Sequence, residues 1–425
     1  MKNNFPVNNR FKNIRESAKS SLLLEIEKSL KEIKETFPDN PEGMGYFYKK
    51  FSTVLKKTSG IYNGKDVIGI MCIQVPEELI YAVGAIPVRI CSGAYSMEQA
   101  ETELLSPKAC PLIKSTMESL YLNIFANGIE PLMIINPTTC DQKKKIGEIE
   151  GTSRIPFYTL ELPPSKDTEE ARFYRQSVVK KLAKKLENVT GQKLTRKRLK
   201  KAISIVSLAQ AQFRRFYNIR KKWPVILGKD AILVSNAYFF DDIISWTYRL
   251  SLLNDELDDR AIKKQYIVSK KAPRIFLTGS PSIFPNMKIP VLIEQLGGII
   301  VAEEFCSSGR LLYDTVAVDE WSLYDMIPAL ADRYLKPCTC PSFTPNIDRE
   351  RKILTMVKDF FADGVIYQSF TGCQLYHMEA KRVEQILEKY EIPMLYIETD
   401  YAADNTGQLT TRVEAFMELL QNKIT

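Results

Sequence analysis

Histidine is almost absent from this chain, which has 425 residues and one histidine, His377. That scarcity excludes a histidine-rich metal site and disfavours Ser-His-Asp and Cys-His mechanisms, because each of them needs a histidine beside its nucleophile. The sequence also lacks a G-x-x-x-x-G-K-[ST] loop and a G-x-G-x-x-G stretch after an expected strand. Nothing in it therefore predicts nucleotide binding.

Long apolar runs are missing as well. No stretch approaches the roughly 20 apolar residues of a membrane-spanning helix, and the opening segment MKNNFPVNNRFKNIRES has no apolar core of the kind found in secretory signals. We therefore expect a soluble, cytoplasmic protein. Its 425 residues suffice for two domains, since single hydrophobic cores stop growing at roughly 250–300 residues.

Cysteine, in contrast, occurs eight times and needs a chemical explanation. Structural disulfides are not expected in a reducing cytosol, and so large a chain does not need them. Paired C-x-x-C knuckles, which are typical of structural zinc sites, do not occur, and Cys338 and Cys340 form the one close pair. Many thiolates without a histidine cluster favour an iron–sulfur cluster over zinc, with inert buried thiols as the alternative.

Positive charge is concentrated in residues 171–222. This segment holds seventeen of the 59 Lys and Arg and is opposed by Glu187 alone, so it carries about +16, while the rest of the chain carries about −8 (42 basic minus 50 acidic residues). Apolar residues recur in it at helical spacing. Two interpretations fit, a solvated helical face and a docking surface for an acidic protein or a phosphate-bearing ligand. Nucleic acid is not expected, because no nucleic-acid-binding motif accompanies the charge.

Short apolar runs alternate with helical stretches on both sides of this segment, which is the signature of parallel α/β sheets. The strands expected before it are 66–71, 86–91, 131–136 and 156–162, and those expected after it are 274–279, 297–304, 364–370 and 393–399. Two such series predict two similar α/β domains. We expect a helical N-terminal lead (1–60), a first α/β domain (61–165), a helical basic insertion (166–265) and a second α/β domain (266–425).

The cysteines fall at informative places on this map. Five of them lie just beyond the carboxyl ends of expected strands or at expected helix starts: Cys72, Cys110, Cys140, Cys306 and Cys373. Ligands of open α/β sheets bind at that edge, and helix N-termini stabilise thiolates. Ligands so far apart in the sequence predict a cluster between the two domains. Cys91, at the end of its own expected strand, fits a packing role.

Several motifs then carry a resemblance to a known family. In chain order they are Cys72-x-x-x-PEELIYAVGAIPVR, ACPLIKS with Cys110, TTCDQKKK with Cys140, RIFLTGSP, GGIIVAEEFCSSGR with Cys306, RYLKPCTC, DGVIYQSFTGC with Cys373, and IETDYAADNTGQLTTRVEAF. With these the chain resembles the 2-hydroxyacyl-CoA dehydratase family, which includes the benzoyl-CoA reductase subunits and the double-cubane cluster proteins. The resemblance covers roughly residues 60–162 and 270–420, and ACPLIKS is most similar to the double-cubane branch.

The resemblance implies two flavodoxin-like (Rossmann-like) domains with an iron–sulfur cluster between them. A dehydratase subunit would bind one [4Fe–4S] cluster through the positions that match Cys110, Cys140 and Cys373, and would pair with a different subunit. A double-cubane member would form a homodimer and would hold an [8Fe–9S] cluster through six cysteines. The additional positions are then Cys72, Cys306 and one of Cys338 or Cys340.

Both branches stay open at this point. The segment EEFCSSGR is also similar to the dehydratase branch, and CTCPSFTPN has two residues more than expected after its first cysteine, which leaves the choice between Cys338 and Cys340 open. Three ligands would leave five of the eight cysteines unexplained, whereas six would leave two. That difference favours the double cubane.

The function that the resemblance implies is low-potential reduction of a small molecule with electrons from an ATP-hydrolysing iron–sulfur activator, which would bind the ATP. Such an oxidoreductase would be oxygen-sensitive and anaerobic, and an acyl-CoA is a candidate substrate. The alternative is the [4Fe–4S] subunit of a benzoyl-CoA-type reductase or of a 2-hydroxyacyl-CoA dehydratase, a lyase that eliminates water by radical chemistry. A non-catalytic electron carrier that needs a paralogous partner is a further hypothesis. We expect neither membrane nor nucleic acid as a partner.

Some polar residues are further candidates. Glu77 and Glu78 begin an expected helix, where they either deliver protons near the cluster or cap the helix. The run Lys143–Lys145 is a candidate surface for docking or for CoA phosphate. The resemblance places the loop Glu398–Tyr401, with Gly407 and Gln408, beside the site, whereas no direct role is expected for His377.

Overall fold

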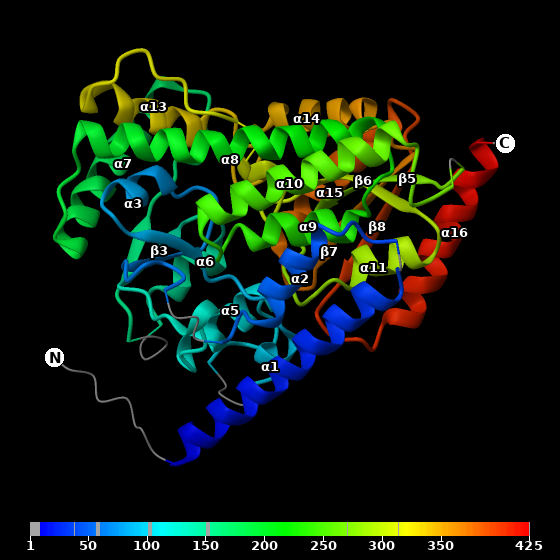
Figure 1. The fold of residues 1–425 in the computed structure, drawn as a ribbon, viewed down its shortest axis with the longest axis horizontal. Helices are drawn as coiled ribbons and strands as arrows, with labels where there is room; N and C mark the ends of the chain where they lie inside the picture. The colour runs from blue at the N-terminus through cyan, green and yellow to red at the C-terminus, as the bar shows by residue number, and fades with distance from the viewer. Residues whose placement is uncertain are drawn as a thin grey trace.

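Two four-stranded parallel sheets form the centre of the molecule. The computed structural model describes residues 9–37, 39–56, 60–100, 104–149, 154–269, 271–312 and 314–424. The expected helical lead over 1–60 therefore lies partly outside the described residues. Figure 1 shows helices around both sheets, with α1 (Asn9–Glu35) along one edge of the molecule and α16 (Thr406–Ile424) at another.

The first sheet follows the helical lead. It contains β1 (Val67–Ile70), β2 (Ile86–Arg89), β3 (Met133–Pro137) and β4 (Phe157–Leu160) in the order β2-β1-β3-β4. Gly69 in the central β1 pairs in parallel with Val88 on one side and with Ile134 on the other. The strands β1, β2 and β3 are buried throughout, as expected where helices cover both faces of a parallel sheet. Three of these helices are α3 (Glu77–Ala82), α5 (Pro111–Tyr121) and α6 (Asp141–Ile146).

The second sheet repeats this topology. It contains β5 (Arg274–Gly279), β6 (Ile299–Glu304), β7 (Gly364–Phe370) and β8 (Met394–Thr399) in the order β6-β5-β7-β8. When the strands are ranked along the chain, both sheets therefore have the order 2-1-3-4. Its helices are α11 (Lys288–Gln295), α14 (Ile347–Asp359), α15 (Gln374–Glu388) and α16. The same strand order places equivalent loops at the carboxyl ends of both sheets.

The basic insertion is helical, as predicted. It contains α7 (Glu169–Thr190), α8 (Arg196–Lys222), α9 (Gly228–Ala237) and α10 (Ile243–Ile262). The side chains of Thr168, Thr195 and Asp242 accept hydrogen bonds from backbone N–H groups and so define where α7, α8 and α10 begin. Helix α8 packs against α3 of the first half and against β6 of the second. The insertion therefore joins the two sheets.

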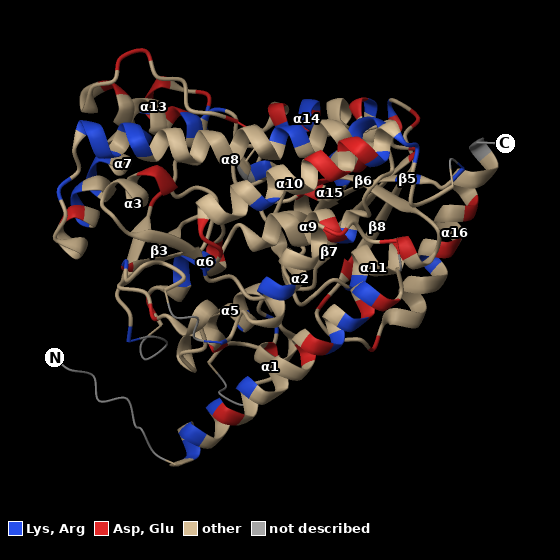
Figure 2. Cartoon of the chain, viewed as in Figure 1, with Lys and Arg blue, Asp and Glu red and all other residues tan. Residues whose placement is uncertain are grey.

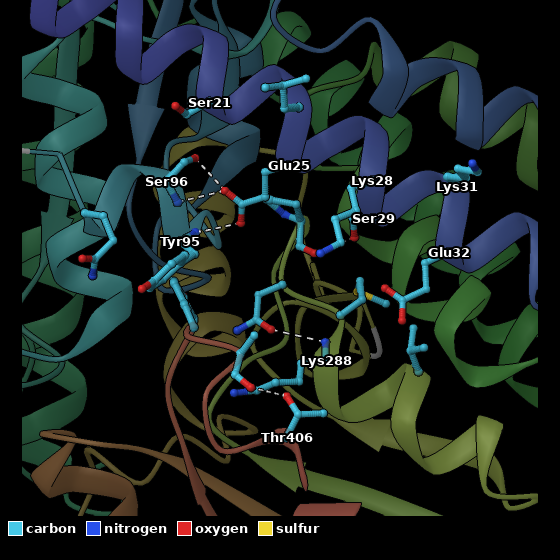
Figure 3. A pocket seen from close by; sticks show the side chains of 18 of the residues that line it. Ser21, Glu25, Lys28, Ser29, Lys31, Glu32, Tyr95, Ser96, Lys288 and Thr406 are labelled. Atoms are coloured by element: carbon cyan, nitrogen blue, oxygen red, sulfur yellow. Dashed lines mark hydrogen bonds between the residues drawn. The ribbon is translucent and has the colours of Figure 1, made fainter.

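A groove of about 1310 Å³ separates α1 from α4 (Tyr95–Glu98) and from the segments that contain Lys288 and Thr406. Figure 3 shows Glu25 of α1 turned toward α4. Its carboxylate accepts hydrogen bonds from the backbone nitrogens of Tyr95 (2.8 Å) and Ser96 (2.9 Å) and from the Ser96 hydroxyl. These hydrogen bonds hold α1 against α4, and no cysteine is among the described residues that line the groove.

The predicted fold class is confirmed, since two parallel α/β sheets carry a helical lead and a helical insertion. Helices α2 (Met44–Ser52), α12 (Gly309–Leu312) and α13 (Leu323–Leu335) and the 3-10 turn Ala126–Gly128 complete the elements. Helix α13 was not predicted. It has Pro328 in its interior and packs on α7. In the described part of the chain no helix is long and apolar enough to cross a membrane. The limits of the four expected regions stay predictions.

Candidate functional site

Seven of the eight cysteines line one cavity of about 800 Å³. The cavity lies between the carboxyl ends of the two sheets, the edge at which ligands of α/β proteins bind. Its cysteines come from both halves of the chain: Cys72, Cys91, Cys110, Cys140, Cys306, Cys340 and Cys373. The structure therefore brings together residues from loops that lie up to three hundred residues apart, and it includes Cys91, for which a packing role was expected.

Local structure explains how the thiols reach this cavity. Cys110, Cys140 and Cys373 each stand immediately before the first residue of a helix, α5, α6 and α15 respectively. Cys72 and Cys306 follow the last residues of β1 and β6 by two positions. The predicted placement of all five at element ends is confirmed. Thiolates at such positions face unpaired backbone N–H groups, which stabilise negative charge.

Two cysteines from opposite halves of the chain contact each other. The thiol of Cys110 donates a hydrogen bond to Cys373. This bond and burial both raise the pKa of Cys110, whereas the bond lowers the pKa of Cys373 to about 7 against the opposing effect of burial. Gln142 of α6 reinforces this junction, since its Oε1 accepts from the Cys110 backbone nitrogen (2.9 Å) and its Nε2 donates to the Gly372 carbonyl (2.9 Å). A side chain on Gly372 would collide with the Lys108 carbonyl, so the two loops require glycine at their contact.

The pair Cys338 and Cys340 divides between two environments. Cys340 lines the cavity, and its thiol interacts electrostatically with those of Cys140, Cys306 and Cys72. Cys338 does not line the cavity, although its thiol also interacts electrostatically with those of Cys340 and Cys72, and its sulfur accepts a hydrogen bond from Gln74 at 2.7 Å. Burial raises the pKa of Cys338 to about 12, so it is a neutral thiol in the protein without bound metal. The geometry favours Cys340 over Cys338 as a ligand.

Three buried cations surround the thiols without a carboxylate partner among the described residues. Lys143 is 8% exposed and donates to the Met71 carbonyl at 2.5 Å. Arg89 donates through Nη1 to the Cys306 carbonyl (2.7 Å) and stacks on Phe239, while its Nε and Nη2 have no hydrogen-bond partner in the described part of the chain.

Arg175 is the third of these cations and is fully buried. Its Nη2 donates to the Gln74 carbonyl, and its Nε and Nη1 have no partner within the described ranges. Burial lowers the pKa of Arg175 to about 10, and the thiols of Cys338 and Cys72 oppose that effect. Burial also disfavours the charged form of Lys143, but the thiols of Cys72 and its neighbours outweigh burial and raise the pKa of this lysine. The cations therefore face the cysteines, and an anion among the thiols would compensate them.

The structure divides the run Lys143–Lys145, since Lys143 is buried and cannot contribute to a docking surface, and such a role of Lys144 and Lys145 stays a prediction. Lys143 is buried in the cavity wall, where its Nζ donates to the Met71 carbonyl just after β1. Lys144 and Lys145 face solvent, where they form ion pairs with Asp141 (3.2 Å) and Glu148 (3.0 Å). Two of the three lysines are thus neutralised locally.

A buried ion network holds the loop that carries Cys340. Glu304, at the end of β6, binds Arg310 (2.6 Å) and Arg349 and accepts a hydrogen bond from the Thr339 hydroxyl (2.6 Å). Burial alone would raise the pKa of Glu304, but the two arginines outweigh burial and lower it to about 2. Because Thr339 stands between Cys338 and Cys340, this network fixes which thiol reaches the cavity.

Glu77 and Glu78 lie on α3 and do not line the cysteine cavity. The Tyr238 hydroxyl donates to Glu77 (2.7 Å) and the Tyr334 hydroxyl donates to Glu78 (2.9 Å). Burial raises the pKa of Glu77 to about 7 and also raises that of Glu78. Glu77 can therefore exchange a proton near neutral pH, and a role of either carboxyl in proton delivery stays a prediction.

The remaining candidates lie at the margin of the site. His377 forms a hydrogen bond with Tyr396 (2.8 Å) and contacts Glu398 (3.3 Å), and it does not line the cavity. Tyr401 packs edge-on against Phe370 in the apolar cluster that contains Cys110, so the loop that carries it does adjoin the thiols. Among the described residues no three His, Cys, Asp or Glu side chains converge on one metal ion. The cysteines of an iron–sulfur cluster need not converge on one point, because they bind different iron atoms.

Arg89 and Arg175 were not predicted as site residues. Arg89 had a signal, since it is a charged residue in the apolar run IPVRIC. Arg175 had none, because it sits in a helix with many other cations. The two parallel α/β sheets thus place a thiol-lined cavity, with buried cations around it, at the sheet edge where ligands of such folds bind.

Comparisons with known proteins identify the family of the chain. The family model described as 2-hydroxyglutaryl-CoA dehydratase, D-component, matches residues 72–420. The chain is 30% identical over 367 residues to YjiM of Escherichia coli (strain K12), provisionally named a dehydratase subunit, with 84% of this chain and 92% of that protein covered. It is 26% identical to the (R)-phenyllactyl-CoA dehydratase beta subunit of Clostridium sporogenes (84% and 92% covered) and 22% identical to a benzoyl-CoA reductase subunit of Thauera aromatica (81% and 87% covered).

The chain belongs to the 2-hydroxyacyl-CoA dehydratase family, and it is an enzyme of that family. The resemblance drawn from the cysteine motifs is thereby confirmed.

Proposed function

We propose that the chain is an iron–sulfur reductase that holds an [8Fe–9S] double-cubane cluster and reduces a small molecule at low potential. Its ligands would be the six cysteines that line the cavity at the predicted positions: Cys72, Cys110, Cys140, Cys306, Cys340 and Cys373. When bound, such a cluster supplies single electrons. Cys91 also lines the cavity, and it would remain a free thiol beside the cluster.

The observation that carries the proposal is the set of three buried cations that face these thiols. A buried, uncompensated cation costs several kcal/mol, and proteins retain one where an anion pairs with it. Lys143, Arg89 and Arg175 have no carboxylate within ion-pair distance among the described residues. Iron-bound thiolates and sulfides are anionic, so a large cluster supplies the missing negative charge.

The chain's own residues supply the rest of the site. The cavity of about 800 Å³ would have to hold both the cluster and a small substrate. Gln142 and the Cys110–Cys373 contact hold the two halves of the site in register. Glu77, with a pKa raised by burial to about 7, is the candidate proton carrier. An ATP-hydrolysing iron–sulfur activator would supply the electrons, and a second copy of the chain would complete a homodimer.

A dehydratase subunit with one [4Fe–4S] cluster is the second candidate. The names of the relatives favour it, because they include (R)-phenyllactyl-CoA and lactoyl-CoA dehydratase beta subunits. In that case three cysteines would suffice, and a paralogous partner subunit and an acyl-CoA substrate would be needed.

The test is an anaerobic turnover assay of the purified chain with a low-potential reductant. The double-cubane proposal predicts that the chain alone reduces small molecules, with no dependence on a second, different subunit. Dehydration of a 2-hydroxyacyl-CoA that appears only after a paralogous subunit is added would replace it with the second candidate. Absence of both activities in iron-loaded protein would favour a non-catalytic electron carrier.

A further inference from the structure

We propose that a second cavity, next to the cysteine cavity, admits small uncharged molecules to the cluster. This inference rests on the proposed function and names the class of molecule that the site would take. The second cavity, called the apolar cavity below, has a volume of about 120 Å³. Its walls include residues of α1, of α2 and the segment that follows it, of β2, and of the end of α5.

The walls of the apolar cavity are mostly aliphatic and aromatic side chains, among them Leu22, Ile26, Phe51 and Phe240. Figure 2 shows charged residues alternating with uncharged ones along α1, and both described α1 residues that line this cavity are apolar. Arg89 is the one charged residue among the described residues of the wall. A charged molecule would lose its hydration on entry, which costs several kcal/mol. The walls therefore favour an uncharged occupant.

Other polar side chains of the wall are hydrogen-bonded within the protein. The Ser119 hydroxyl donates to the Ser115 carbonyl (2.8 Å), and the Ser115 hydroxyl donates to the Ser92 Oγ (2.7 Å). The Asn236 side chain donates to one backbone carbonyl and accepts from one backbone nitrogen. A water molecule needs about two to four polar partners in a cavity, and apolar cavities bind guests such as xenon or benzene instead. The apolar cavity is therefore suited to weakly polar molecules.

The apolar cavity borders the cysteine cavity, because Arg89, Cys91 and Ile283 line both of them. Arg89 is the last residue of β2, and its Nη1 donates to the Cys306 carbonyl (2.7 Å). Its guanidinium lies 3.8 Å from the ring centroid of Phe239, which belongs to the wall of the apolar cavity. Single side chains therefore separate the two cavities. A molecule in the apolar cavity would be next to the cluster without passing through the mouth of the cysteine cavity.

Another part of the wall lies at the surface. Val54 and Leu55, which follow α2, and Phe125 and Ala126, which follow α5, line the apolar cavity and are partly exposed. The two segments meet, since the backbone nitrogen of Asn127 donates to the Val54 carbonyl at 2.5 Å. This side of the apolar cavity is the entrance that we assign to small molecules.

The volume of the apolar cavity limits the size of its occupant. A water molecule takes up roughly 30 Å³ of the liquid, and an engineered apolar cavity of about 150 Å³ binds benzene. At about 120 Å³ the apolar cavity holds a molecule of a few heavy atoms. An acyl-CoA is too large for it, so the substrate of a dehydratase subunit would have to use the cysteine cavity.

Xenon is the probe for the apolar cavity, because it is uncharged, small and visible in crystals. Crystals of the anaerobically purified full chain under xenon pressure should show xenon in this cavity. The test variant is Ser119→Leu, which adds an apolar side chain to the wall. The matched control is Ser204→Leu on α8: both hydroxyls donate to the carbonyl four residues earlier, but Ser204 is exposed and lines neither cavity. Ser204→Leu should keep the xenon, and Ser119→Leu should lose it.

Two oxidants of the dithionite-reduced, iron-loaded chain measure access to the cluster. Dioxygen is small and uncharged, and it takes one electron from the cluster to become superoxide. Ferricyanide is a larger anion, and it takes one electron to become ferrocyanide. Ser119→Leu should slow the oxidation by dioxygen several-fold and leave the ferricyanide rate unchanged, whereas Ser204→Leu should behave as the wild type. Ala126→Leu, which narrows the entrance, replaces Ser119→Leu if that variant does not fold.

A wild-type chain that binds no xenon in the apolar cavity would overturn the proposal. Equal dioxygen rates for the wild type and Ser119→Leu would also overturn it, since dioxygen would then reach the cluster by another route. So would equal slowing with both oxidants, which would show that the substitution alters the cluster itself. A chain that contains no iron fails the proposed function, whereas xenon binding needs no cluster and still decides whether the apolar cavity takes uncharged molecules.

Discussion

The thiol of Cys110 donates a hydrogen bond to Cys373, although the two residues begin helices in different halves of the chain. Each of them is placed by its own parallel sheet, and both sheets have the strand order 2-1-3-4. The contact therefore shows that a loop from each half of the chain reaches the same point between the two sheets. A group bound there would be held by both halves of the molecule.

Cys373 is expected to be the most reactive thiol of the chain without bound metal. The hydrogen bond from Cys110 lowers its pKa to about 7, and its side chain is partly exposed. Alkylation by iodoacetamide should accelerate as the pH rises through about 7, because the thiolate is the nucleophile. Mass spectrometry of a short labelling reaction should find Cys373 modified first. Cys140, also partly exposed but with a pKa raised by burial, is the internal control, and its earlier modification would contradict the assignment.

Replacement of Lys143 by methionine should act in opposite directions on the two forms of the protein. Without a cluster the buried cation lacks an anionic partner, so Lys143→Met should leave the melting temperature unchanged or raise it. With a cluster the substitution should lower the reduction potential by tens of millivolts, about 60 mV if the cation stabilises the one-electron reduced form by about 1.4 kcal/mol. An EPR-monitored redox titration measures this shift.

Lys144→Met is the matched control, since Lys144 is exposed and paired with Asp141. It should change neither the melting temperature nor the potential. An equal shift of potential in both variants would show that Lys143 acts only through net charge.

Glu304→Gln is expected to destabilise the chain by about 3–5 kcal/mol, because it leaves Arg310 and Arg349 buried without their carboxylate. Urea unfolding measures this change. The pKa of Glu304 falls from 4.5 in its unperturbed form to about 2 in the fold, so its contribution is complete above pH 4.5 and is lost as the pH falls toward 2. Glu350→Gln removes the half-exposed pair with Arg382 and should cost about 1 kcal/mol at most. Similar losses in the two variants would rule out a special role for the buried network.

Serine substitutions show which of the two cysteines in the C-T-C segment, Cys338 or Cys340, binds iron. Cys340→Ser should lose iron, because Cys340 lines the cavity among the other candidate ligands. Cys338→Ser should retain its iron, because Cys338 does not line the cavity and its sulfur accepts a hydrogen bond from Gln74. Iron analysis of both variants after anaerobic purification measures the difference. If only the Cys338→Ser variant lost iron, Cys338 and not Cys340 would be the ligand.

The sequence predicted the sheets and the positions of the thiols because both depend on local patterns. Apolar runs mark buried parallel strands, and a cysteine just after such a run must fall at the sheet edge. Burial of charge could not be predicted in this way, since it depends on what packs on a side chain. Lys143 and Lys144 are neighbours with the same side chain, yet one enters the cavity wall and the other faces solvent. Arg175 could not be distinguished from the surrounding cations for the same reason.

The most direct test of the account is the iron and acid-labile sulfide content of the anaerobically purified chain. A double cubane held by six cysteines predicts about eight irons per chain, and a single cubane held by three predicts about four. A variant in which Lys143, Arg89 and Arg175 are all replaced by methionine should contain less iron and sulfide per chain than the wild type. About eight irons in the wild type would support the proposed function, whereas protein free of iron and sulfide would contradict it.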